Sequence, residues 1–151
     1  MALNQSCFYK WRCLIALAGV DAKLDPAEKK FFAKQIDDLK AEGISEEQMR
    51  TLLEELKHPR QPEVYFMRVD DPIEKIDLLR MAYFLFISDN HFEIREQQVY
   101  EYLRREISKS LKIDEKTLDH FAQMKNEKLG VSIKPVIKEF LKRKNIAHKE
   151  Y

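Results

Sequence analysis

Apolar residues recur at helical spacing along most of the chain. Phe8, Trp11, Ile15 and Ala18 follow this spacing, and they predict a helix over residues 3–20. The same periodicity predicts further helices that begin near residues 25, 46, 72, 93, 115 and 133, with a short helix at 63–69. The pattern therefore predicts an all-α fold, a helical bundle of about seven to eight helices.

The segment 72–87 differs from the other predicted helices. Leu79, Tyr83 and Phe86 form an inward stripe, but residues 78–87 are apolar almost all round. A helix with apolar residues on every side is stable in water only when its neighbours cover it. We therefore expect this segment to be the buried central helix.

Residues typical of helix ends mark several boundaries. Gly43 is a natural C-terminal residue because it tolerates positive φ. Ser45 followed by Gln48 forms a capping box. Further N-caps are predicted at Asp25, Asp71, Asp114 and Ser132.

An acidic pattern occurs twice between predicted helices. The first copy has Asp21, Leu24, Asp25 and Glu28, and the second has Asp89, Phe92, Glu93 and Glu96. The copies lie 68 residues apart, and the residues around them align at the same offset. With one extra residue in the second half, residues 44–52 align with 113–121. The chain is thus expected to be a single domain, 1–151, built from pseudo-twofold related units at about 9–56 and 77–125.

The repeated acids suggest oxygen ligands for a hard cation. An acid in an interhelical turn and another in the next helix's first turn can converge on one small volume. Carboxylate and carbonyl oxygens suit Ca²⁺, Mg²⁺ or Mn²⁺ better than zinc or copper. The spacing is not that of an EF-hand loop, which alternates its acids around a central glycine.

Helix capping is the alternative explanation of the same acids. Asp25, Pro26 and Glu28 would make a good helix start without any metal. The segment 71–74 has the same Asp-Pro-x-Glu form with no acid four residues earlier. Capping does not require Asp21 or Asp89, so these two residues separate the alternatives.

Composition indicates a soluble globular protein, with 44% hydrophobic and 35% charged residues. The net charge of +1 is unevenly distributed, because residues 125–151 carry +5 and the preceding residues carry −4. Lys134, Lys138 and Lys142 form a stripe on the basic C-terminal helix, 132–144. This stripe is either a solvated face or a weak contact with anionic membrane lipid, and no aromatic interleaving indicates specific nucleic-acid binding.

Several function classes lack support in the sequence. No nucleophile setting or glycine-rich phosphate loop is present, so we do not expect an enzyme. Cys7 and Cys13 lie too far apart on one helix to form a disulfide, which favours a reduced cytoplasmic location. His91, inside the second acidic turn, is either solvent-exposed or a nitrogen ligand or proton donor.

Residues 14–32, LIALAGVDAKLDPAEKKFF, and residues 84–102 resemble the TerB-like family. This family includes tellurite-resistance proteins and the N-terminal domain of some membrane-anchored DnaJ-type co-chaperones. The resemblance covers about residues 10–125 and implies an all-helical bundle with a divalent-cation site. Matched positions give the ligands Asp21, Asp25 and Glu28 in the first turn and Asp89, Glu93 and Glu96 in the second.

The chain departs from the family pattern after each first acid, where the family has glycine. Ala22 occupies this position in the first copy and Asn90 in the second. Asparagine tolerates left-handed backbone whereas alanine does so poorly, so the second turn is expected to bind a cation more readily.

The expected function is a small cytosolic module that binds a divalent cation or a protein partner in a stress response of the tellurite-resistance type. The alternative is a protein-interaction adaptor whose acidic turns are only helix caps. Sensitivity of the melting temperature to a chelator separates the two.

Overall fold

The computed structural model describes residues 3–19, 26–58, 60–84, 94–123 and 134–143. These ranges contain eight α-helices and no strand, which confirms the all-α prediction for the described part of the chain. The helices are α1 (Gln5–Ala18), α2 (Pro26–Asp38), α3 (Glu46–Lys57), α4 (Pro62–Phe66), α5 (Pro72–Ala82), α6 (Ile94–Leu111), α7 (Glu115–Ala122) and α8 (Lys134–Arg143), with a short 3₁₀ helix η1 (Leu39–Glu42). The chain divides into two compact units, Met1–Val69 and Asp70–Tyr151.

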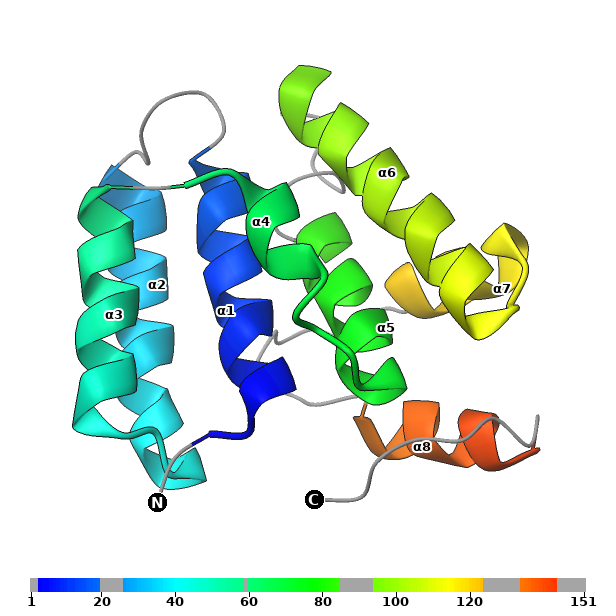
Figure 1. The fold of residues 1–151 in the computed structure, drawn as a ribbon, viewed down its shortest axis with the longest axis horizontal. Coiled ribbons are helices and arrows are strands. Elements are labelled where there is room, and N and C mark those ends of the chain that lie inside the picture. The colour runs from blue at the N-terminus through cyan, green and yellow to red at the C-terminus, as the bar shows by residue number, and fades with distance from the viewer. Residues whose placement is uncertain (1–2, 20–25, 59, 85–93, 124–133, 144–151) are drawn as a thin grey trace. The chain divides into compact units, whose positions relative to one another are not determined.

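In the first unit, α1 packs against α3 and α4, and α2 packs against α3 (Figure 1). α1 is buried along most of its length, and Cys13, Leu14 and Ile15 are fully covered. Phe32 and Ile36 of α2 and Leu52 of α3 complete this core at 1% exposure or less. The broad apolar stripe of the first predicted helix is therefore the centre of a core.

Helix α1 begins two residues later than predicted because Asn4 caps it. The Asn4 side chain accepts a hydrogen bond from the Cys7 backbone N–H at 2.8 Å. Leu3 precedes the cap and is fixed by Gln48, whose amide accepts from the Leu3 N–H and donates to the Leu3 carbonyl. The first turn of α3 thus fixes the entry to α1.

The connection from α2 to α3 follows the predicted signals. Gly43 ends η1 with a φ of 94°, in the left-handed region that glycine enters without strain. Ser45 and Gln48 form the predicted capping box, because each side chain accepts a hydrogen bond from the other residue's backbone N–H. On α3, Leu52 and Leu56 are buried, whereas Leu53 is 40% exposed.

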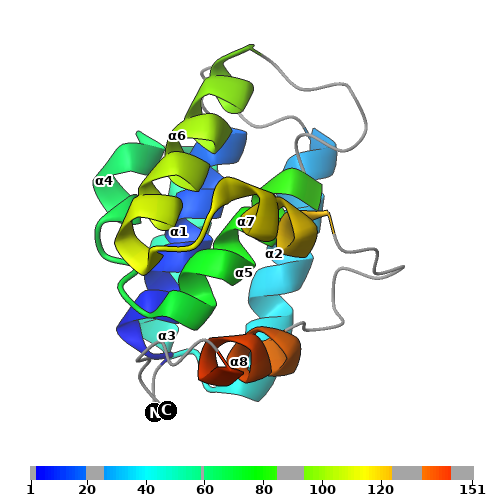
Figure 2. The same ribbon diagram turned by 90° about the vertical axis from the view of Figure 1, so that its right-hand side faces the viewer.

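In the second unit, α6, α7 and α8 all pack against α5. Figures 1 and 2 show α8 lying across the end of α5 at which that helix begins. Ile76, Leu78 and Leu79 are fully buried, so α5 is the central helix of this unit, as predicted for the segment. Tyr83 is only half-buried, and Phe86 lies outside the described residues.

Helix α7 begins where the sequence predicts. The Asp114 carboxylate accepts from the Thr117 N–H at 2.7 Å, and Leu118 and Phe121 turn into the core. The predicted cap Ser132 of the last helix lies outside the described residues. In α8, Ile137 and Leu141 are buried, whereas Val136 is 46% exposed.

None of the described helices combines the length and apolar character needed to span a bilayer.

Candidate functional site

The structure describes little of the predicted cation site. Asp21, Asp25, Asp89 and Glu93 lie outside the described residues. Glu28 lies in the first turn of α2 and is half-buried. Glu96 belongs to the first turn of α6, but its side chain is not among those that the structure describes. His91 of the second turn lies outside the described residues. Among the side chains that are described, no group of three His, Cys, Asp or Glu residues could hold a metal ion.

The helices that lie one helix beyond the two acidic turns begin at corresponding positions. α3 starts at Glu46 and α7 at Glu115, 69 residues later. This offset is the one that the sequence alignment gives between residues 44–52 and 113–121.

The turn that precedes α3 and the turn that precedes α7 share their backbone geometry. Gly43 and Lys112 both have positive φ, and the next residues form equivalent bonds. The Ile44 N–H donates to the Leu39 carbonyl, and the Ile113 N–H donates to the Ser108 carbonyl, each at 3.2 Å. Both pairs span five residues and precede a side-chain N-cap, Ser45 or Asp114.

The segment 71–74 shows what an Asp-Pro-x-Glu sequence does without a preceding acid. The Asp71 carboxylate caps α5 and accepts from the Ile73 N–H at 3.0 Å, with Pro72 at the first helical position. α2 also starts at a proline, Pro26, one residue after Asp25. An Asp-Pro-x-Glu sequence can therefore start a helix in this chain without a cation.

A buried ion pair in the first unit was not predicted from the sequence. The Arg12 guanidinium of α1 donates hydrogen bonds to the Glu55 carboxylate of α3, and the shortest of these, from Nη2 to Oε2, is 2.8 Å. The hydroxyl of Tyr65, from α4, donates to the same Glu55 carboxylate. Three helices therefore meet at one carboxylate that is only 7% exposed.

Aromatic rings surround the Arg12 guanidinium. Its central carbon lies 4.4 Å from the ring centre of Tyr65, 5.0 Å from that of Tyr9 and 5.3 Å from that of Phe8. Burial alone would lower the pKa of Arg12, but the hydrogen bond and charge of Glu55 outweigh it and raise the pKa. Burial, then the hydrogen bond from Tyr65 to Glu55, raises the pKa of Tyr65. Arg12, Glu55 and Tyr65 are thus hydrogen-bonded to one another, which is typical of a structural network.

Charged residues also lie under the second unit's surface. The Lys134 ammonium of α8 lies 2.8 Å from the Glu74 carboxylate of α5, whose side chain is 3% exposed. Asp77 and Arg80 of α5 are buried as well, with Oδ1 and Nη1 3.9 Å apart. Lys134, one of the three lysines of the predicted stripe, is therefore an ion-pair partner that joins α8 to α5, and its side chain is 34% exposed.

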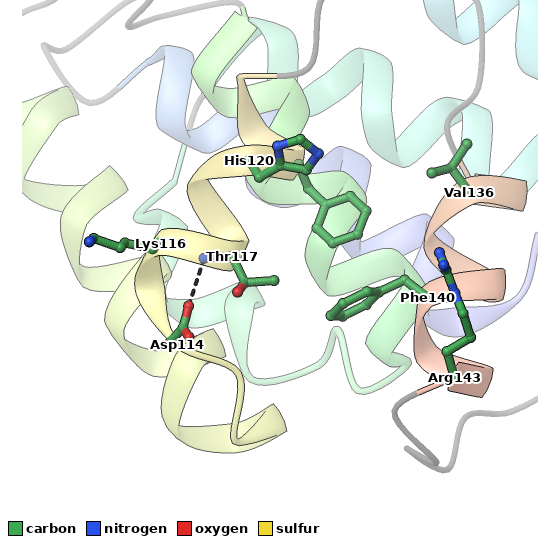
Figure 3. A pocket seen from close by; sticks show the side chains of 8 residues that line it. Asp114, Lys116, Thr117, His120, Val136, Phe140 and Arg143 are labelled. Carbon is green, nitrogen blue, oxygen red and sulfur yellow. Dashed lines mark hydrogen bonds between the residues drawn. The ribbon is translucent and has the colours of Figure 1, made fainter.

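A hollow of about 540 Å³ lies between α7 and α8 (Figure 3). Its apolar part consists of Phe121, Val136 and Phe140, and the rings of Phe121 and Phe140 meet edge to face at 4.9 Å. Its polar lining consists of Asp114, Lys116, Thr117, His120 and Arg143. A hollow of this size is within the range of ligand sites, and no motif in the sequence marked it.

The described cysteines offer no reactive thiol. Cys7 and Cys13 are both reduced and buried, and Cys13 is fully covered. Burial, with a smaller contribution from the charge of Glu63, raises the pKa of Cys13 to about 12. A thiol with this pKa is almost entirely protonated at neutral pH, so Cys13 is a core residue rather than a nucleophile.

Comparison with family models, curated proteins and solved structures finds no match for this chain. The TerB-like resemblance therefore depends on the two motifs of the sequence, and the functional argument depends on the chemistry of the residues.

Proposed function

We propose that this chain is a non-catalytic helical module of the TerB-like kind that binds a divalent cation through the acids of its two interhelical turns. The ligands in this proposal are Asp21, Asp25 and Glu28 from the first turn and Asp89, Glu93 and Glu96 from the second. The cation is Ca²⁺, Mg²⁺ or Mn²⁺, because carboxylate oxygens favour these ions. A role in stress response is part of the proposal through the family resemblance alone.

One observation carries the proposal: α3 and α7, the helices one helix beyond the acidic turns, begin 69 residues apart, each after a side-chain N-cap, Ser45 or Asp114. Gly43 and Lys112, two residues before these caps, both have positive φ. Acids at matching positions of the sequence are thus followed by matching local structure. This supports two related units, each of which supplies one set of ligands.

A second candidate is a protein-interaction adaptor whose acidic turns only cap helices. The Asp71 cap favours it, because a carboxylate followed by proline starts α5 with no cation involved. In this alternative Asp25 has the same role at α2, and Asp21 and Asp89 are solvated acids.

Thermal melting distinguishes the two candidates. The wild-type chain and Asp89→Asn are each melted with a chelator and with millimolar Ca²⁺, Mg²⁺ or Mn²⁺. The proposal predicts that the cation raises the wild-type melting temperature with the logarithm of its concentration and that Asp89→Asn abolishes this rise. Asp37→Asn is the matched control, because Asp37 is an exposed acid on α2 that pairs with Lys40.

The adaptor candidate predicts different curves. Cation and chelator would then give the same melting temperature for every variant. Asp25→Ala would lower stability by about 1 kcal/mol through loss of an N-cap, whatever the cation concentration.

A further inference from the structure

The hollow between α7 and α8 combines an apolar base with a polar rim that carries Arg143 and His120 (Figure 3). We propose that it binds an acidic peptide segment of a partner protein, which inserts one aromatic or aliphatic side chain beside Val136 and Phe140. Carboxylates that flank this anchor would pair with Arg143 and accept a hydrogen bond from His120. The proposal does not depend on the cation site, whose acids lie on other segments.

The apolar part of the hollow is suited to a single anchoring side chain. Phe121 is 4% exposed and forms the base, with its ring against Phe140. Val136 is 46% exposed, although its neighbours Ile137 and Leu141 are buried. A partner side chain that covers Val136 and the edge of Phe140 would remove this apolar surface from water.

The polar part of the hollow favours negative charge. Lys116 and His120 lie one turn apart on α7, and Arg143 lies on α8, all three exposed. None of them forms an ion pair with another residue in the described part of the chain. Asp114 is the one acid that lines the hollow, and its carboxylate already accepts the Thr117 N–H. The rim therefore presents the Arg143 guanidinium, which an acidic side chain complements, with the His120 ring at the end of α7 (Figure 3).

The same geometry argues against two other occupants. Nucleic-acid bases need an exposed aromatic face for stacking, but Phe121 is buried and meets Phe140 edge to face. A lipid surface would need the apolar face of α8, yet Ile137 and Leu141 are buried where α8 packs on α5. An acidic peptide uses the groups that remain accessible.

A display library of random short peptides tests the proposal on the full chain, in the presence of a chelator so that no cation contributes. We expect the enriched peptides to carry Asp or Glu on either side of an aromatic or aliphatic residue. One enriched peptide is then labelled with fluorescein, and its Kd is measured by anisotropy against wild type and variants. Circular dichroism establishes that each variant is folded.

Two variants alter the hollow, and a third provides the control. Arg143→Glu should raise the Kd about tenfold, because it places a like charge at the rim. Val136→Asp should raise it about tenfold or more, because the anchor then meets a carboxylate. Lys142→Glu reverses an exposed charge on the same helix outside the hollow and should change the Kd by about twofold or less.

The proposal is overturned if the library yields no enrichment, or if enriched peptides are basic or lack an apolar residue. It is also overturned if Arg143→Glu and Lys142→Glu change the Kd equally, since binding would then follow net charge alone. Tighter binding of a labelled single-stranded oligonucleotide or of anionic vesicles than of the peptide would assign the surface to those partners instead.

Discussion

Gly43 and Lys112 lie 69 residues apart, and both have a backbone φ in the left-handed region, 94° at Gly43 and 56° at Lys112. Each precedes an apolar residue and then an N-cap, Ser45 before α3 and Asp114 before α7. Glycine adopts this conformation without strain, whereas lysine does so at a cost. The two connections thus have the same shape but are not equally strained.

This difference predicts opposite effects of substitution. Gly43→Ala should lower the free energy of unfolding by about 1 kcal/mol, through backbone strain alone. No atom lies within 4 Å of a Cβ at position 43, so steric overlap adds nothing. Lys112→Gly should raise stability by about 0.5–1 kcal/mol, because relief of strain exceeds the added freedom of the unfolded chain. Urea unfolding with an unchanged m-value measures both, and equal destabilisation by the two variants would contradict the shared geometry.

The Arg12–Glu55 pair predicts a strong, coupled effect on stability. Arg12→Met leaves the Glu55 carboxylate, 7% exposed, without its cation and should cost about 2–3 kcal/mol. Tyr65→Phe removes a second donor to that carboxylate and should cost about 1–2 kcal/mol. The double variant Arg12→Met/Glu55→Leu should lose less free energy of unfolding than the sum of the losses from Arg12→Met alone and Glu55→Leu alone. The reason is that the double variant leaves no buried charge unpaired.

The matched control for this pair is Lys40→Met. Lys40 and Asp37 also lie 2.8 Å apart, but both side chains are more than half exposed. Solvent screens such a pair, so the urea midpoint should hardly move. If Arg12→Met were as mild as Lys40→Met, the network around Glu55 would contribute no stability.

Cys13 predicts how stability changes with pH. Burial raises its pKa from 9.0 to about 12, so between these values the unfolded chain loses this proton before the folded chain does. The contribution of Cys13 to the free energy of unfolding is therefore fully present below pH 9. It falls between pH 9 and the folded pKa of about 12, by up to about 1.4 kcal/mol per pH unit. Burial raises the pKa of Tyr100 and of Tyr65 in the same direction, which adds to the decline above their ordinary value of 10.0.

Urea unfolding of wild type and Cys13→Ala from pH 8 to pH 10.5 measures this effect. Both chains retain the tyrosines, so the difference in slope above pH 9 isolates the thiol. Cys13→Ala should be less stable at pH 8, from the cavity it leaves, but should lose stability more slowly as the pH rises. Parallel pH profiles would show that the Cys13 thiol titrates normally.

Much of the helical structure could be predicted because its signals are local. The capping box at Ser45, the proline start of α5 and the Asp114 cap each involve residues within one turn. The start of α1 was placed two residues too early, because periodicity alone does not show that Asn4 takes the cap. The left-handed Lys112 was missed, since lysine gives no sequence signal for positive φ.

The buried charges could not be predicted because their partners are distant in the sequence. Arg12 and Glu55 are 43 residues apart, and only packing of α1 against α3 brings them together. The partner of Lys134 is Glu74, 60 residues earlier in the sequence, and only the packing of α8 against α5 brings the two together. The hollow could not be predicted either, because it forms only where α7 and α8 lie side by side. The acidic turns are visible in the sequence, but most of their residues lie outside the described part of the chain.

The most direct test of the central claim is a calorimetric titration of the purified chain with Mn²⁺, Mg²⁺ and Ca²⁺. It compares wild type, the double variant Asp21→Asn/Asp89→Asn and the control Asp37→Asn, whose side chain is exposed on α2. The account predicts saturable binding of at least one cation to wild type and control, and its loss in the double variant. No binding to the folded wild-type chain, or equal binding by all three, would contradict a cation site in the two acidic turns.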